Sequence, residues 1–178
     1  MSVLAQRLLA VHDSLTQAGL PHAIGGAIAL GYCTSEPRGT RDLDVNVFVT
    51  TDRAGEVLDA LPDAVNVTTP DCEQLEREGQ VRVWWEDTPI DLFLDVLSFH
   101  REVAQSVRHV PFMERTIPVL GCTALAVFKA MFDRTRDWAD IEAMAEVSAI
   151  DLDAAAHWVQ EMDGPHSLRA RRLLSLRS

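Results

Sequence analysis

The sequence predicts an α+β fold in which a mixed β-sheet flanked by helices is followed by a helical C-terminal part. Two observations carry this prediction. Before about residue 120, several short segments alternate apolar and polar residues, which is typical of half-buried strands. From Gly121 onward the apolar residues recur at helical spacing. We therefore expect an α/β core over residues 1–120 and a helical region over residues 121–178.

The first 120 residues alternate between helical and extended patterns. We expect helices where apolar residues recur every three or four positions, and strands where apolar and polar residues alternate. The expected helices are 3–18, 27–32, 54–61 and 98–107. The expected strands are 21–24, 42–49, 65–68, 80–86, 90–97 and 110–119. Beyond Gly121, the expected helices are 122–132, 138–147, 152–162 and 168–176.

The composition bounds the class of protein. The chain has 178 residues, of which 47% are hydrophobic, so it is large enough to bury a core. The formal net charge of −11 argues against wide, non-specific wrapping of nucleic acid. The first ten residues lack the basic head and long apolar run of a signal peptide, and nothing resembles a membrane span. We expect a cytoplasmic protein with no membrane partner.

The three cysteines predict no metal site. Cys33, Cys72 and Cys122 are far apart and show neither a Cys-x-x-Cys pair nor Cys/His metal spacing. We expect them to be buried, reduced thiols.

Acidic residues mark the strand expected at 42–49, which follows a loop containing Arg38 and Arg41. One face carries Leu43, Val45, Val47 and Val49. Asp42, Asp44 and Asn46 share the opposite face, where the two carboxylates lie about 6–7 Å apart. Two carboxylates on one face of a core strand repel each other unless a cation lies between them. A divalent metal ion suits this arrangement.

The strand expected at 90–97 repeats the pattern. Ile90, Leu92, Leu94 and Val96 share one face, and Asp91, Phe93 and Asp95 share the other. Two such strands can bring three carboxylates together, as a two-Mg²⁺ phosphoryl-transfer site requires. Asp91 is the preferred third carboxylate because it lies at the start of its strand, as Asp42 and Asp44 do. Asp95 is the alternative.

Gly25 and Gly26 stand between an expected strand and an expected helix. Glycines let the backbone approach a ligand closely, and the free N–H groups at a helix start favour phosphate. The alternative is a tight turn selected only for packing.

In the strand expected at 80–86, Trp84 and Trp85 cannot face the same side. We expect one of them in the core and the other to cover a domain seam, with stacking on a base as the alternative.

These features together resemble a known superfamily. Gly25-Gly26, then Asp42-x-Asp44, then a single strand aspartate is similar to the DNA polymerase β-like nucleotidyltransferases. Arg38-x-Thr40-x-Asp42-Leu43-Asp44 resembles the AbiEii-type toxins and related small bacterial nucleotidyltransferases. The segment 125–140 resembles the same branch, and the resemblance covers roughly residues 21–142.

The resemblance implies roles for individual residues. Asp42, Asp44 and Asp91 would bind Mg²⁺, and Asp91 would help to activate the acceptor hydroxyl. Gly25 and Gly26 would lie against the triphosphate, although many members have Gly-Ser and use the serine hydroxyl there. Arg38, Thr40 and Lys129 would contact phosphates. For Lys129 the alternative is a surface charge ladder with Asp133 and Asp137.

The expected function is Mg²⁺-dependent transfer of a nucleoside monophosphate from an NTP to a hydroxyl, with release of pyrophosphate. The acceptor stays open among a tRNA 3′ end, a protein hydroxyl and a small molecule such as an aminoglycoside. A toxin–antitoxin role with a cognate antitoxin fits the toxin branch. The competing class is a non-catalytic module that binds a nucleotide or a partner with the same fold.

Overall fold

The structure is a computed structural model that describes residues 2–177. It divides into two compact units. The core unit is the chain up to Gly26 together with Gly39–Val119. The helical unit is Ala27–Arg38 together with the chain from Leu120 onward.

The core unit is built on a mixed six-stranded sheet with the order β3-β4-β2-β1-β6-β5. The strands are β1 (His22–Ile24), β2 (Leu43–Thr50), β3 (Gln80–Trp85), β4 (Thr88–Asp95), β5 (Arg108–Phe112) and β6 (Arg115–Val119). β2 runs parallel to β4 and antiparallel to β1, and β3 is antiparallel to β4 at one edge of the sheet. The predicted α+β class with a mixed sheet is confirmed.

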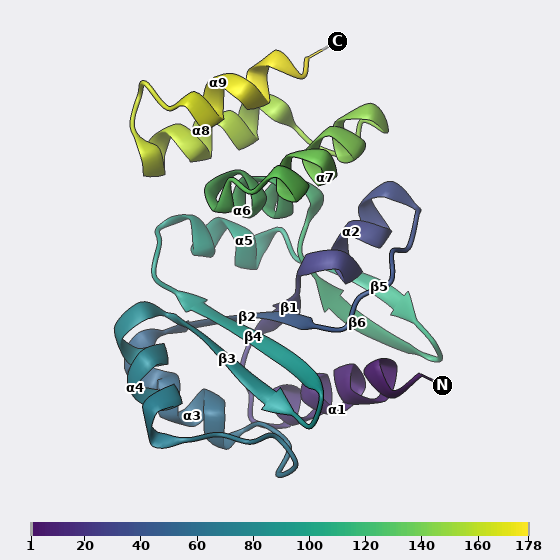
Figure 1. The fold of residues 1–178 in the computed structure, drawn as a ribbon, viewed down its shortest axis with the longest axis vertical. Helices are drawn as coiled ribbons and strands as arrows, with labels where there is room; N and C mark the ends of the chain where they lie inside the picture. Colours follow the sequence, from purple (N-terminus) through teal and green to yellow (C-terminus); the bar gives the residue numbers. More distant parts are fainter. Residues whose placement is uncertain (1, 178) are drawn as a thin grey trace. The chain divides into compact units, whose positions relative to one another are not determined.

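Helices pack on this sheet because its strands present continuous aliphatic rows. They are α1 (Val3–Gln17), α3 (Ala54–Asp59), α4 (Thr69–Glu78) and α5 (Phe99–Gln105), with a short 3₁₀ turn, η1 (Thr51–Arg53), before α3. Figure 1 shows α1, α3 and α4 on one side of the sheet. Leu8, Val11 and Leu15 repeat at helical spacing along α1 and are fully buried.

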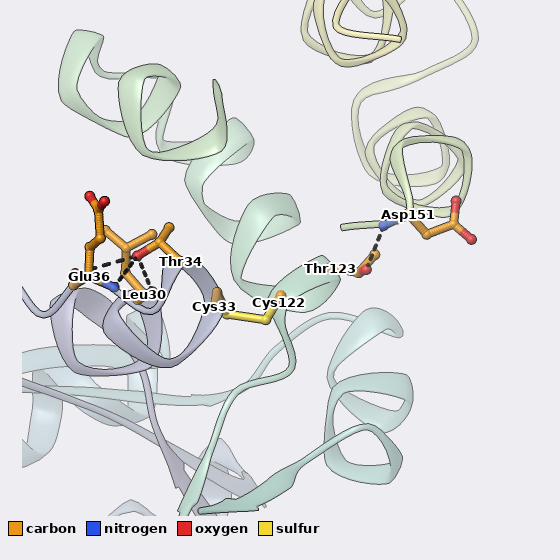
Figure 2. Close-up of a disulfide and its surroundings, with 7 residues drawn as sticks. All are labelled: Leu30, Cys33, Thr34, Glu36, Cys122, Thr123 and Asp151. Atoms are coloured by element: carbon orange, nitrogen blue, oxygen red, sulfur yellow. Dashed lines mark hydrogen bonds between the residues drawn. A yellow bond between two sulfur atoms is a disulfide. The ribbon is translucent and has the colours of Figure 1, made fainter. Parts of the chain in front are cut away.

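The helical unit contains α2 (Gly26–Thr34) except for its first residue, Gly26, which belongs to the core unit. It continues with α6 (Cys122–Phe132), α7 (Thr135–Glu146), α8 (Leu152–Asp163) and α9 (Leu168–Ser175). Figure 2 shows a disulfide between Cys33, near the end of α2, and Cys122, the first residue of α6. Nearby, the Thr123 hydroxyl accepts a hydrogen bond from the Asp151 backbone N–H at 3.0 Å.

The disulfide corrects the expectation of reduced thiols at Cys33 and Cys122. The two Cα atoms lie 5.6 Å apart, within the range that a disulfide spans, although 89 positions separate them in the sequence. Cys72 is a free thiol, but it is half-buried rather than buried. Because disulfides are rare in reducing compartments, this bond weighs against the cytoplasmic location, which stays a prediction. Within residues 2–177, no helix is both long and apolar enough to cross a membrane.

Three other expectations are modified. The segment 65–68 forms no strand and contributes one isolated bridge, between Asn66 and Trp84. The segment 110–119 belongs to two strands, β5 and β6, which pair as a hairpin. The expected division had a single boundary at residue 120, whereas each of the two units is built from two separate segments of the chain. Residues 27–38 group with the helical unit, in which the Cys33–Cys122 disulfide also joins α2 to α6.

Candidate active site

Asp42 and Asp44 lie at the beginning of β2. The residues between and after them, Leu43, Val45 and Val47, are fully buried, as strand alternation predicts. Asp44 therefore lies on the opposite face, where it is half-buried. Asp42 directly precedes the strand, and its carboxylate accepts a hydrogen bond from the Thr40 hydroxyl. Thr40 thus orients the first carboxylate of the pair.

The register between β2 and β4 brings a third carboxylate beside this pair. Asp91 lies opposite Asp44 in the parallel ladder, so about 4.8 Å separates their backbones. Asp95 lies opposite Thr50, further along the strands. The Asp95 carboxylate is instead 3.8 Å from Nδ1 of His100, a residue whose pKa is lowered by burial.

Arg82 joins this acidic group from β3, and the sequence analysis did not single it out. It lies opposite Asp91, and its guanidinium donates from Nε to Oδ1 at 2.7 Å and from Nη2 to Oδ2 at 2.6 Å. The hydrogen bond that Arg82 donates to Asp91 raises the pKa of Arg82. Desolvation opposes this rise, and the charges of Asp91, Asp42 and Asp44 add to it. The three carboxylates and Arg82 therefore form one electrostatic cluster. The alternation in β3, which sets Arg82 on the face opposite Val81 and Val83, was the available signal.

The Gly25-Gly26 turn packs directly on Asp44. The Gly25 N–H donates to the Asp44 backbone carbonyl at 2.8 Å. Gly26 has a φ of +53°, and a Cβ built there would lie 1.8 Å from Oδ2 of Asp44. No side chain fits this position without displacing the carboxylate. Packing against Asp44 is therefore sufficient reason for glycine at residue 26, and a phosphate contact stays a prediction.

Lys129 and Arg38 belong to a charged network in the helical unit. The Lys129 ammonium donates to Asp140 at 2.6 Å and to Asp137 at 3.4 Å, and all three residues are buried. Arg38 donates to both oxygens of Asp140, at 2.7 and 3.1 Å, and Arg134 donates to both oxygens of Asp137. The alternative of a surface charge ladder is wrong, because Lys129 is only 8% exposed.

The electrostatics of this network follow from the same contacts. Burial acts to raise the pKa of Asp137, but hydrogen bonding to Arg134 and the charge of Lys129 outweigh it, so the pKa is lowered. Asp133, the other expected partner of Lys129, accepts hydrogen bonds from the Trp138 indole and from Arg169 instead. Contact of Lys129 or Arg38 with a nucleotide stays a prediction.

The carboxylates of the core unit suit a divalent cation, although they are not arranged as a finished site. Among residues 2–177, no group of three or more His, Cys, Asp or Glu side chains has the geometry to hold a metal ion. Asp91 is turned to Arg82, and Asp42 to Thr40. The donor set nevertheless consists of carboxylate oxygens, which Mg²⁺ prefers. The Gly26 backbone also approaches the Asp44 carboxylate so closely that a Cβ at residue 26 would fill the space between them.

Comparison with known proteins identifies the fold. No protein-family model matches the sequence, and no curated protein is similar enough to match. The crystal structure of ANT(2″)-Ia in complex with adenylyl-2″-tobramycin superposes with a TM-score of 0.62 at 13% identity, covering 98% of both chains. The solution structure of ANT(2″)-Ia has a TM-score of 0.64 at 12% identity, covering 97% of this chain and 94% of that one.

A nucleotidyltransferase-like protein from Paracoccidioides brasiliensis gives a TM-score of 0.54 at 12% identity, with 98% of this chain and 88% of that chain covered. At such identities the likeness shows the fold. The chain has the nucleotidyltransferase fold, as the resemblance implied.

Proposed function

We propose that this protein is a Mg²⁺-dependent nucleotidyltransferase that moves a nucleoside monophosphate from an NTP to a hydroxyl acceptor. The observation that carries the proposal is the alignment of Asp44 and Asp91 on adjacent strands, with the Gly25-Gly26 turn packed on Asp44. The nucleotidyltransferase fold supports the same chemistry.

The reaction assigns a separate task to each part of the site. Asp42, Asp44 and Asp91 would hold Mg²⁺, which neutralises charge on the α-phosphate and the leaving group when it is bound. Backbone N–H groups at Gly26 and the start of α2 would bind the triphosphate, and Gly25, whose N–H donates to Asp44, would lie against it. The missing serine hydroxyl is then replaced by main-chain donors. Arg38, Thr40 and Lys129 remain proposed phosphate contacts.

The bonds made and broken follow from these positions. The acceptor oxygen forms a bond to the α-phosphorus, and the bond from that phosphorus to the β-phosphate oxygen breaks. Asp91 takes the hydroxyl proton, and pyrophosphate leaves with the electron pair. The two hydrogen bonds from Arg82 fix the orientation of the Asp91 carboxylate.

An aminoglycoside-like small molecule is the acceptor that specific observations favour. The net charge of −11 and the acidic face of β2 and β4 attract a polycation. ANT(2″)-Ia, to which this chain is similar in fold, has been crystallised with adenylyl-2″-tobramycin. A tRNA 3′ end and a cognate antitoxin rest on the resemblance to AbiEii-type toxins alone.

The test supplies α-labelled NTPs and Mg²⁺ with a panel of acceptors: aminoglycosides, total RNA and cell lysate. We expect labelled product in one acceptor class, and a loss of about 100-fold or more in Asp44→Asn, which keeps the side-chain shape but removes the charge. An Asp44→Asn variant as active as the wild type would exclude the assignment. A product that forms only from RNA would move the acceptor to nucleic acid, and the rate should then fall steeply with salt.

The third carboxylate is decided by a matched pair of variants. We expect Asp91→Asn to lose transfer as Asp44→Asn does, and Asp95→Asn to keep most of it. The non-catalytic alternative predicts calorimetric binding of Mg-NTP with no labelled product from any acceptor. Equal losses in the Asp91 and Asp95 variants would contradict the assignment of Asp91.

A further inference from the structure

Trp84 is exposed on the same face of the sheet as the acidic cluster. The register pairs Arg82 with Asp91 and Trp84 with Pro89, and paired residues share a face. Trp84 is therefore the diagonal neighbour of Asp91, at about 7–8 Å, a gap that an aromatic side chain spans. Its exposed fraction is 45%, whereas Trp138 is 2% exposed. A large aromatic surface thus stands open beside the proposed reaction centre.

The backbone that carries Trp84 is fixed from both sides. The Trp84 carbonyl accepts a hydrogen bond from the Asn66 N–H at 2.8 Å, in addition to the β3–β4 ladder. The following hairpin turn is held by Arg7 of α1, which is buried, donates to Asp87 at 2.8 Å and stacks over Trp85. A ring on so constrained a strand binds a ligand with little loss of conformational entropy.

The sheet order indicates what reaches Trp84. In phosphoryl transfer, the attacking and leaving oxygens lie roughly in line across the phosphorus. The proposed triphosphate position follows β1, whereas Asp91 and Trp84 lie on β4 and β3, on the other side of β2. With pyrophosphate leaving on the β1 side, the acceptor approaches over β4 and β3. Trp84 is therefore on the acceptor side of the reaction centre.

The charges beside Trp84 indicate the chemistry of that acceptor. Asp42, Asp44 and Asp91 face Arg82, whose guanidinium is engaged by Asp91, so the surroundings carry a net negative charge. A tryptophan ring binds ammonium groups through its π-face and packs against the apolar face of a sugar ring. A polyanion such as RNA would be repelled by the same carboxylates.

We propose that Trp84 is the floor of an acceptor subsite that takes an amino sugar, stacking its ring on the indole and presenting a hydroxyl to Asp91. This inference rests on the proposed function, and it adds a binding residue and a ligand class to it.

The experiment compares Trp84→Ala, Trp84→Phe and Gln80→Ala with tobramycin and MgATP as substrates. Gln80 is the matched control, since it also lies two residues from Arg82 on the same face of β3. We expect Trp84→Ala to raise the KM for tobramycin about 10–100-fold, with the KM for MgATP unchanged. Trp84→Phe keeps a stacking ring and should change the KM about 3-fold or less, and Gln80→Ala should leave it unchanged.

A second readout requires no turnover. Titration with tobramycin should quench tryptophan fluorescence in the wild type and in Gln80→Ala, and should not do so in Trp84→Phe. Transfer to tobramycin with an unaltered KM in Trp84→Ala overturns the subsite but leaves the proposed function standing. Quenching that depends on Trp84 in a chain without transferase activity supports the subsite and refutes the function. RNA serving as acceptor while tobramycin neither reacts nor quenches overturns the amino-sugar assignment.

Discussion

The substitution Gly26→Ala tests the contact between the glycine turn and Asp44. At a φ of +53°, an alanine costs about 1–2 kcal/mol of backbone strain. Its Cβ would stand 1.8 Å from Oδ2 of Asp44, whereas ordinary contact begins at 3.4 Å, so the carboxylate must move by 3.4 − 1.8 = 1.6 Å. A displacement of about 1 Å at a reacting centre can cost about 100-fold in rate. We therefore expect a loss of that order in nucleotide transfer.

Gly19→Ala provides the control, because Gly19 has a φ of +68° and nothing lies within 4 Å of its Cβ position. Both variants carry the backbone strain, and we expect each to lower the melting temperature by about 2–8 °C. Only Gly26→Ala should lose transfer. Wild-type activity in Gly26→Ala, or equal loss in Gly19→Ala, would refute the account of the turn. The assay is incorporation of α-labelled NTP, with melting followed by circular dichroism.

Three further predictions concern stability. Lys129→Met removes the ammonium partner of the buried Asp140, which keeps Arg38, and should cost about 1–3 kcal/mol in urea unfolding, part of which Asp140→Asn in the same chain should restore. Cys33→Ser should cost about 2–4 kcal/mol, and reductant should weaken the wild type to the same level without affecting the variant. Burial lowers the pKa of His12 and of His22, so the unfolded state, with histidine pKa values near 6.5, binds protons first as the pH falls. Stability should therefore decrease below about pH 6.5, and less so in His12→Asn; a midpoint independent of pH between 7 and 5 would contradict this.

The period-2 pattern of the strands allowed the main elements of the candidate site to be predicted from local sequence. Alternation in 42–49 and 90–97 separated aliphatic from acidic residues, and burial follows the same alternation along β4 and, except at the buried Asn46, along β2. Asp91 is aligned with Asp44, although it lies in the middle of β4, which begins at Thr88, and not at the start of its strand as expected. The prediction from alternation worked because the side-chain direction in a strand depends only on neighbouring residues.

Features that depend on distant parts of the chain were missed. The disulfide joins residues 89 positions apart, and spacing alone gave no indication of it. The contact between Lys129 and Asp140 requires α6 and α7 to pack against each other. The helical spacing suggested Asp133 and Asp137 as partners, and of these two Asp137 contacts Lys129. Arg82 could be set on a strand face, but its pairing with Asp91 follows from the register of the hairpin.

The balance of charge distinguishes the two acidic clusters. In the helical unit, Asp137 and Asp140 are met by three cations, including Lys129, and their oxygens accept hydrogen bonds at 2.6–3.4 Å. Both aspartates of that cluster are fully paired with cations, which is typical of a structural role for their carboxylates. In the core unit, Arg82 brings one positive charge to the three carboxylates of the candidate site. Their excess negative charge at the glycine turn favours binding of a divalent cation, and it distinguishes the proposed metal-binding aspartates from the paired aspartates of the helical unit.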